Sequence, residues 1–202
     1  MSERNWDVWQ GRLGGARAHR YYGTYGKPQN PELEHRGRME LASSLIAGKS
    51  VLDIGCGIGH LLHFVKEGID YVGADTSPAM IRVAKSFTPN GIFRIGDIYD
   101  LSPFDMFDTV LCQSVLIHLP KIKIPIQEMW NHARRAIVFS IPIGGIKVVR
   151  PLDRYGDKLI LMHTETWENI EAIIKTLDGV KDVEKHLEPG TRMGNTYVRV
   201  IK

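Results

Sequence analysis

The sequence has 202 residues, of which 43% are hydrophobic and 24% are charged, so the chain is long and apolar enough to bury a core without disulfides or metals. Its formal net charge of +3 is only mildly basic and the basic residues form no dense cluster, so there is no clear signal for nucleic acid. Cys56 and Cys112 lack metal-ligand spacing, so we expect no metal site. We find neither a signal-peptide pattern nor a run of roughly 18 apolar residues, so we expect one cytoplasmic domain without a membrane segment.

Residues 1–31 differ from the rest of the chain because aromatic residues, glycines and basic residues alternate there without a repeat. Two interpretations stay open. The segment is either an arm whose aromatic rings pack on the surface of the domain, or a lid that covers a ligand site.

A helix is predicted over residues 31–47, with Asn30 as its N-cap and Pro31 in its first turn. Arg36 and Arg38 lie on this helix. Side chains of this kind usually face solvent, but a guanidinium beside a ligand site binds a carboxylate with two parallel hydrogen bonds. Both arginines are therefore candidate partners of a ligand carboxylate.

Three alternating glycines follow an apolar run over residues 50–54: Gly55, Gly57 and Gly59. The pattern predicts a buried parallel strand, a tight loop and a helix over residues 58–67. Glycine permits positive φ and lets a ligand approach bare backbone, and a helix N-terminus offers unpaired amides, so we expect a nucleotide-like ligand. The dinucleotide fingerprint needs glycine where His60 stands, which argues against NAD.

Further apolar runs over residues 71–75, 92–98 and 107–112 indicate three more strands. Their carboxyl ends meet at one crevice of an open α/β sheet, where ligands bind. Asp75 stands at such an end and is expected to accept hydrogen bonds from ribose hydroxyls, because Ser77 already caps the next helix.

Asp53 ends the first strand, and a buried carboxylate is costly without a partner. We expect it to bond to the glycine-loop amides, to the adjacent helix, or to a ligand ammonium through water.

Four segments, in order, resemble the class I S-adenosylmethionine-dependent methyltransferase family, of the small-molecule type 11/12-like kind: VLDIGCGIGHLL, YVGADTSPAMIRVAK, FRIGDIYDL and FDTVLCQSVLIHLP. The resemblance implies an α/β Rossmann-like fold, with a seven-stranded, mostly parallel sheet, one antiparallel strand, and helices on both faces. It also implies S-adenosyl-L-methionine as the cofactor and S-adenosyl-L-homocysteine as the product.

The resemblance assigns cofactor contacts by position. Asp97 and Ile98 would read the adenine, and Thr76 and Met80 would line its pocket. Gln113 and the residues after it would contact the methionine part. The cofactor residues expected in full are Asp53, Gly55, Cys56, Gly57, Gly59, Asp75, Thr76, Met80, Asp97, Ile98, Gln113 and His118.

Candidates for the acceptor side are weaker. A neutral His118 has the chemistry of a general base, but a packed, hydrogen-bonded role is an equal alternative. If residues 1–31 form a lid, Tyr21 and Tyr22 would place their rings over the sulfonium. Residues 144–162 are expected to be an irregular insertion at the carboxyl edge of the sheet, with substrate contacts from Arg150, Arg154 and Tyr155.

The remaining elements predicted are helices over residues 121–132, interrupted early by Pro125, and 163–177, and strands over residues 135–141, 180–187 and 196–201. We expect a single methyltransferase domain over residues 1–202. It divides into the N-terminal arm or lid (1–31), a cofactor-binding half (32–142), and a substrate-side insertion with the C-terminal helix and hairpin (143–202).

The function expected is methyl transfer to an O or N atom of an unidentified small-molecule acceptor. Motifs of the adenine, glutamine and cytosine methyltransferases, N-P-P-Y, D-P-P-Y and a Pro-Cys nucleophile, are absent from the sequence. The alternatives are a methyltransferase acting on tRNA, protein or a lipid-linked substrate, and a protein that binds the cofactor without catalysis.

Overall fold

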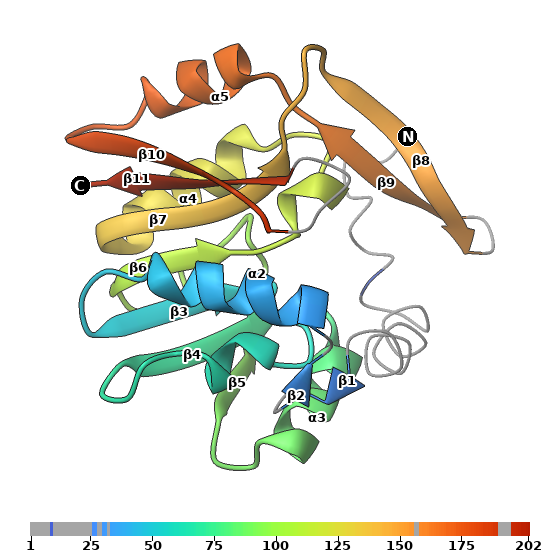
Figure 1. Cartoon of the computed structure of the whole chain (residues 1–202), viewed down its shortest axis with the longest axis vertical. Helices are drawn as coiled ribbons and strands as arrows, with labels where there is room; N and C mark the ends of the chain where they lie inside the picture. Colours follow the sequence, from blue (N-terminus) through green and yellow to red (C-terminus); the bar gives the residue numbers. More distant parts are fainter. Residues whose placement is uncertain (1–8, 10–25, 28–29, 32, 156–157, 190–194) are drawn as a thin grey trace.

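The computed structural model describes residues 9, 26–27, 30–31, 33–155, 158–189 and 195–202, and the side chains of residues 149–159 lie outside that description. Seven strands form one sheet in the order β10-β11-β7-β6-β3-β4-β5 (Figure 1). Their bounds are β3 Ser50–Ile54, β4 Asp70–Asp75, β5 Ile92–Ile95, β6 Phe107–Cys112, β7 Ala133–Pro142, β10 Asp182–Leu187 and β11 Asn195–Ile201. The strand β11 runs antiparallel to both of its neighbours, whereas β3 to β7 are mutually parallel. The predicted fold class is confirmed.

The two faces of the sheet are covered by different helices (Figure 1). On one face α2 (Leu33–Ser44), the 3-10 turn η2 (His60–His63) and α3 (Pro78–Phe87) share a buried cluster with Val51 of β3. On the other face α4 (Lys123–His132) and α5 (Trp167–Ile174) share a cluster with Leu52. Successive residues of a strand point to opposite faces, so the apolar run in β3 supplies both cores.

The helix predicted over residues 58–67 is wrong, because only η2 forms there. Gly59 precedes η2 in the left-handed region, with φ 84°, so helical backbone cannot begin before His60. Leu61 of η2 is buried in the cluster that contains Val51, and Phe64 packs against that cluster. The apolar spacing of this segment therefore reflects packing onto the sheet and not a long helix.

The start predicted for the first helix is also wrong. Asn30–Pro31 form strand β2, which pairs with β1 (Gly26–Lys27), and α2 begins at Leu33. Proline is compatible both with a first helical turn and with an edge strand, so Pro31 did not distinguish the two. Pro125 does not interrupt α4, because it lies in the first turn, where its missing N–H removes no helical hydrogen bond.

The irregular insertion predicted over residues 144–162 is wrong as well. Strands β8 (Val148–Tyr155) and β9 (Lys158–Thr164) form an antiparallel hairpin outside the main sheet (Figure 1). The apolar residues Ile160, Leu161 and Met162 are buried, which makes β9 part of the packed structure. Since β9 continues to Thr164, α5 starts only at Trp167, capped by Thr166, whose hydroxyl accepts from the Asn169 amide.

Candidate cofactor site

A cavity lies at the carboxyl ends of β3, β4, β5 and β6, the place predicted from the sequence. Eleven of the twelve residues expected at a cofactor line it: Asp53, Gly55, Cys56, Gly57, Asp75, Thr76, Met80, Asp97, Ile98, Gln113 and His118. Gly59 does not line the cavity. A Cβ on Gly59 would stand 2.8 Å from the ring of Phe93, so this glycine serves the packing behind the loop.

The glycine loop is held by hydrogen bonds to the neighbouring strand β4. The amides of Gly55 and Cys56 donate to the carbonyl of Ala74 at 2.6 and 2.9 Å. Gly55 and Gly57 have φ values of 83° and 56°, which L side chains rarely adopt. Nothing lies within 4 Å of the place where a Cβ of Gly57 would stand, so the loop leaves open space on the cavity side.

Asp75 connects this loop to helix α3. Its Oδ2 accepts from the Gly57 amide at 3.0 Å, and its Oδ1 accepts from the Ser77 amide at 2.8 Å. Burial raises the pKa of Asp75 to about 6, although these two hydrogen bonds oppose the rise. Each carboxylate oxygen has two lone pairs, so Asp75 keeps capacity to accept from ligand hydroxyls.

Asp53 has a different partner from those expected. Its Oδ2 accepts from the hydroxyl of Tyr71 at 2.7 Å, while the loop amides go to Ala74 and Asp75. Burial raises the pKa of Asp53 to about 7, the Tyr71 hydroxyl lowers it, and the charge of Asp75 raises it further. The cavity thus holds two carboxyl groups whose ionised forms are disfavoured until a compensating ligand arrives.

At the strand β5 end, Asp97 organises a turn. Its Oδ1 accepts from the Tyr99 amide at 3.0 Å, and its carbonyl accepts from the Asp100 amide at 3.0 Å. Ile98 between them is buried. Asp97 and Ile98 both line the cavity at this end.

After β6, Gln113 donates to the Tyr197 hydroxyl at 2.5 Å. Ser114 has φ 57°, the only positive value outside glycine in the described residues, and its amide donates to the Ser140 hydroxyl at 2.8 Å. Strained backbone of this kind is often found at functional sites. Ser114 lies in the stretch after Gln113 that the resemblance assigned to the methionine part, whereas Ser140 was predicted only as part of a strand.

His118 lies in the short turn η3 (Leu116–His118), with its Nδ1 at 2.8 Å from the carbonyl of Leu161 in β9. Since a carbonyl oxygen only accepts, Nδ1 carries the hydrogen, and in a neutral imidazole Nε2 then holds the lone pair. The Trp9 ring, which also lines the cavity, lies 5.2 Å from the His118 ring.

Helix α2 contributes His35 and Arg38 to the cavity wall, of which the sequence analysis proposed only Arg38. Arg38 lines the cavity and forms an ion pair with the buried Glu188. Arg36, the other arginine considered, lies instead over the ring of Phe64, 5.9 Å from its centroid. His35 also lines the cavity, and burial, then nearby His60 and Arg38, lower its pKa to about 3.

Comparison with known proteins shows what this chain resembles. A family model described as a methyltransferase domain matches residues 51–136, the segment with the glycine loop and the strand ends around the cavity. The whole chain also superposes on magnesium protoporphyrin IX methyltransferase from Synechocystis PCC 6803, solved with bound S-adenosylmethionine. The TM-score is 0.69, with 20% identity over 100% of this chain and 98% of that one. The chain has the fold of the class I methyltransferases.

The curated relatives that this chain matches differ in what their names say they act on. The chain is 34% identical over 127 residues to the tRNA U34 carboxymethyltransferase of Shewanella pealeana, matching 56% of this chain and 38% of that protein. It is 30% identical over 121 residues to the trans-aconitate 2-methyltransferase of Escherichia coli O1:K1, matching 58% and 45%. The match thus spans less than half the length of these relatives, and it does not indicate the acceptor.

Several predicted acceptor-side residues lie outside the part of the chain that the structure describes. Tyr21 and Tyr22 lie outside the described residues. Arg150, Arg154 and Tyr155 belong to β8 by their backbone pairing, but their side chains are outside the description. The described residues contain no group of three or more side chains suited to a metal ion, and no described helix is long and apolar enough to cross a membrane.

Proposed function

We propose that this protein binds S-adenosylmethionine in the cavity and transfers its methyl group to an O or N atom of a small-molecule acceptor. The observation that carries the proposal is the Asp75 carboxylate, which bonds to the glycine loop and to the start of α3 and still faces the cavity. A second-strand carboxylate in this position suits ribose hydroxyls.

The donor set fits the cofactor. Two carboxyl groups, the buried Asp53 and the half-buried Asp75, suit a ligand that carries an ammonium, a sulfonium and ribose hydroxyls. The open space at Gly57 admits the ligand against backbone. Asp97 and Ile98 offer an acceptor and an amide for adenine, and Arg38 is the cation in the cavity wall that suits the methionine carboxylate.

The chemistry asks little of the protein, because the sulfonium supplies an activated methyl group. This chain's residues have to align the acceptor atom with that methyl group and exclude water. His118 is the candidate to take a proton from a hydroxyl or amine acceptor, since its Nδ1–H is committed to Leu161 and its Nε2 is the basic nitrogen. If bulk water instead takes the proton from the acceptor, methyl transfer does not need His118.

The domain division and the cytoplasmic location inferred from the sequence remain predictions. Residues 32–142 supply the described cavity wall except Trp9, which lies within the arm or lid of residues 1–31. Residues 143–202 supply the β8–β9 hairpin and the partners Leu161, Glu188 and Tyr197.

The acceptor class is tested by transfer of a radiolabelled methyl group from S-adenosylmethionine into a cell extract that is then separated into small molecules, tRNA, protein and lipid. Label in the small-molecule fraction supports the proposal. Label confined to tRNA, protein or lipid identifies the alternative acceptor. Cofactor binding without label in any fraction favours a non-catalytic binding protein.

A further inference from the structure

Two histidines tie the β8–β9 hairpin to the wall of the cofactor cavity. His118 of η3 donates through Nδ1 to the carbonyl of Leu161 in β9, at 2.8 Å. His163 of β9 lies with its Nδ1 at 2.8 Å from the carbonyl of Leu119, directly after η3. The two contacts are reciprocal: η3 supplies the His118 ring to a carbonyl of β9, and β9 supplies the His163 ring to the carbonyl that follows η3. Their effect is to fix β9 against residues 118–119, both of which line the cavity.

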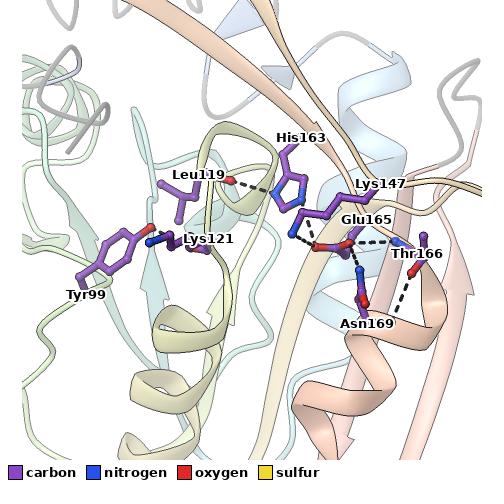
Figure 2. A network of polar contacts seen from close by, with 8 residues as sticks. All are labelled: Tyr99, Leu119, Lys121, Lys147, His163, Glu165, Thr166 and Asn169. Atoms are coloured by element: carbon purple, nitrogen blue, oxygen red, sulfur yellow. Dashed lines mark hydrogen bonds and ion pairs between the residues drawn. The ribbon is translucent and has the colours of Figure 1, made fainter. Parts of the chain in front are cut away.

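The second side of the His163 ring is held by a carboxylate. His163 and Glu165 are fully buried side chains, and Nε2 of the histidine lies 3.1 Å from Oε2 of Glu165. Figure 2 shows that the ring stands between the Leu119 carbonyl and the Glu165 carboxylate, so both of its nitrogens face oxygen.

Glu165 is itself held from several directions (Figure 2). Its Oε2 accepts from Lys147 Nζ at 2.9 Å, and its Oε1 accepts from the Asn169 side chain at 2.9 Å and the Thr166 amide at 3.1 Å. Its backbone is bonded to the end of β7, through the carbonyl of Pro142 and the amide of Gly144. These contacts fix the position of the Glu165 carboxylate, and the carboxylate in turn fixes the orientation of the His163 ring.

We infer that His163 is a positioning residue for His118. By bonding to Leu119 it holds β9 in register with η3, which keeps the Leu161 carbonyl in place for Nδ1 of His118. That bond selects the tautomer of His118 whose basic nitrogen is Nε2. The importance of this for catalysis rests on the proposed function, whereas the positioning itself is measurable without any acceptor.

Two matched substitutions separate the two contacts of His163, each of which is a hydrogen bond only when the nitrogen that faces the oxygen carries a hydrogen. The amide nitrogen of asparagine stands as many bonds from Cα as Nδ1 of histidine, and that of glutamine as many as Nε2. His163→Asn therefore keeps a donor for Leu119 and loses the Glu165 contact, whereas His163→Gln does the reverse. His163→Phe removes both bonds, and His63→Gln, on the exposed side of η2 beside Thr88, is the control.

The readout is the tautomer of His118, observed by proton–nitrogen correlation of labelled histidine rings and assigned with His118→Gln. We expect one Nδ1–H tautomer in the wild type, in His163→Asn and in the control, and a shift toward a mixture in His163→Gln and His163→Phe. Should the phenylalanine variant fail to fold, the asparagine and glutamine pair decides. An unchanged His118 tautomer in folded His163→Gln, or its loss in His163→Asn, overturns the inference.

S-adenosylhomocysteine binding to the same samples keeps the two proposals apart. A wild type that does not bind the ligand refutes the proposed function, while the tautomer experiment still tests the positioning. If binding is intact, we expect His163→Gln to lower kcat by roughly tenfold once the acceptor is known, with KM for the cofactor unchanged.

Discussion

The Asp75 carboxylate lies 3.0 Å from the Gly57 amide and 2.8 Å from the Ser77 amide, so one side chain joins the glycine loop to the following helix. The proposed cofactor site would therefore depend on Asp75 twice, through the geometry of the glycine loop and through the capacity of the carboxylate to accept hydrogen bonds from the ligand. Several measurements follow from it and from its neighbours.

Asp75→Asn should weaken S-adenosylhomocysteine binding by at least about tenfold, equivalent to about 1.4 kcal/mol, because an amide cannot accept at both oxygen positions. The fold should persist, since the substitution also removes a carboxyl group whose pKa is raised in the folded chain. Calorimetric titration gives the affinity, and Asp105→Asn, at an exposed position, is the control. Equal affinities for the two variants would remove Asp75 from the site.

Gly55→Ala should destabilise the protein more than Gly68→Ala. The two glycines have nearly the same φ, 83° and 82°, so both substitutions strain the backbone alike. Only at Gly55 does the new Cβ meet a neighbour, Cγ2 of Val115 at 2.1 Å, whereas nothing lies within 4 Å at Gly68. Overpacking of this kind typically costs about 1–3 kcal/mol, which thermal or urea unfolding resolves. Similar losses at both positions would show that the contact with Val115 relaxes freely.

The ionisation of Asp53 and Asp75 should make the stability of the folded protein depend on pH. Burial raises their pKa values to about 7 and about 6, from an ordinary value of 3.8. Their contribution to stability is therefore complete below the ordinary pKa and is lost as the pH rises through 6 and 7. We expect the midpoint of thermal unfolding of the ligand-free protein to fall as the pH rises from 3.8 to about 7, and to fall less in Asp53→Asn. An identical pH profile in wild type and variant would contradict the assignment.

Arg38 should discriminate between ligands with and without a carboxylate. Arg38→Met removes the cation proposed for the methionine carboxylate, so binding of S-adenosylhomocysteine should weaken while binding of methylthioadenosine, which lacks that carboxylate, stays the same. Arg36→Met is the control, because Arg36 lies over Phe64 and not in the cavity wall. Equal weakening for both ligands would mean that Arg38, through Glu188, only supports the structure.

The strands and the carboxyl ends of the site could be predicted from sequence because a buried parallel strand is a continuous apolar run, and β3 and β6 match the predicted bounds. Asp53, Asp75 and Asp97 follow such runs, so topology alone brings them to one crevice. Their cofactor roles are still predictions.

The rest depends on contacts between distant residues. The Tyr71 hydroxyl that bonds to Asp53 and the ion pair of Arg38 with Glu188 have no local signature. The β8–β9 hairpin has one, the Gly156-Asp157 pair between two strand-like runs, which the prediction of an irregular insertion passed over. Glycines at 55, 57 and 59 indicated a loop, but the left-handed backbone of Gly59 delays helical backbone to His60, and only the short turn η2 forms there. Local pattern thus predicts the elements, and tertiary packing decides which side chains they bring together.

The central claim is that the cavity binds an adenosyl-sulfur cofactor, and thermal unfolding of the wild type with S-adenosylhomocysteine or NAD tests it most directly. At a hundredfold excess over the dissociation constant, a ligand that binds only the folded chain stabilises it by about 2.7 kcal/mol. We predict that S-adenosylhomocysteine raises the unfolding midpoint by several degrees and that NAD leaves it unchanged. Stabilisation by NAD alone, or by neither ligand, would contradict the account.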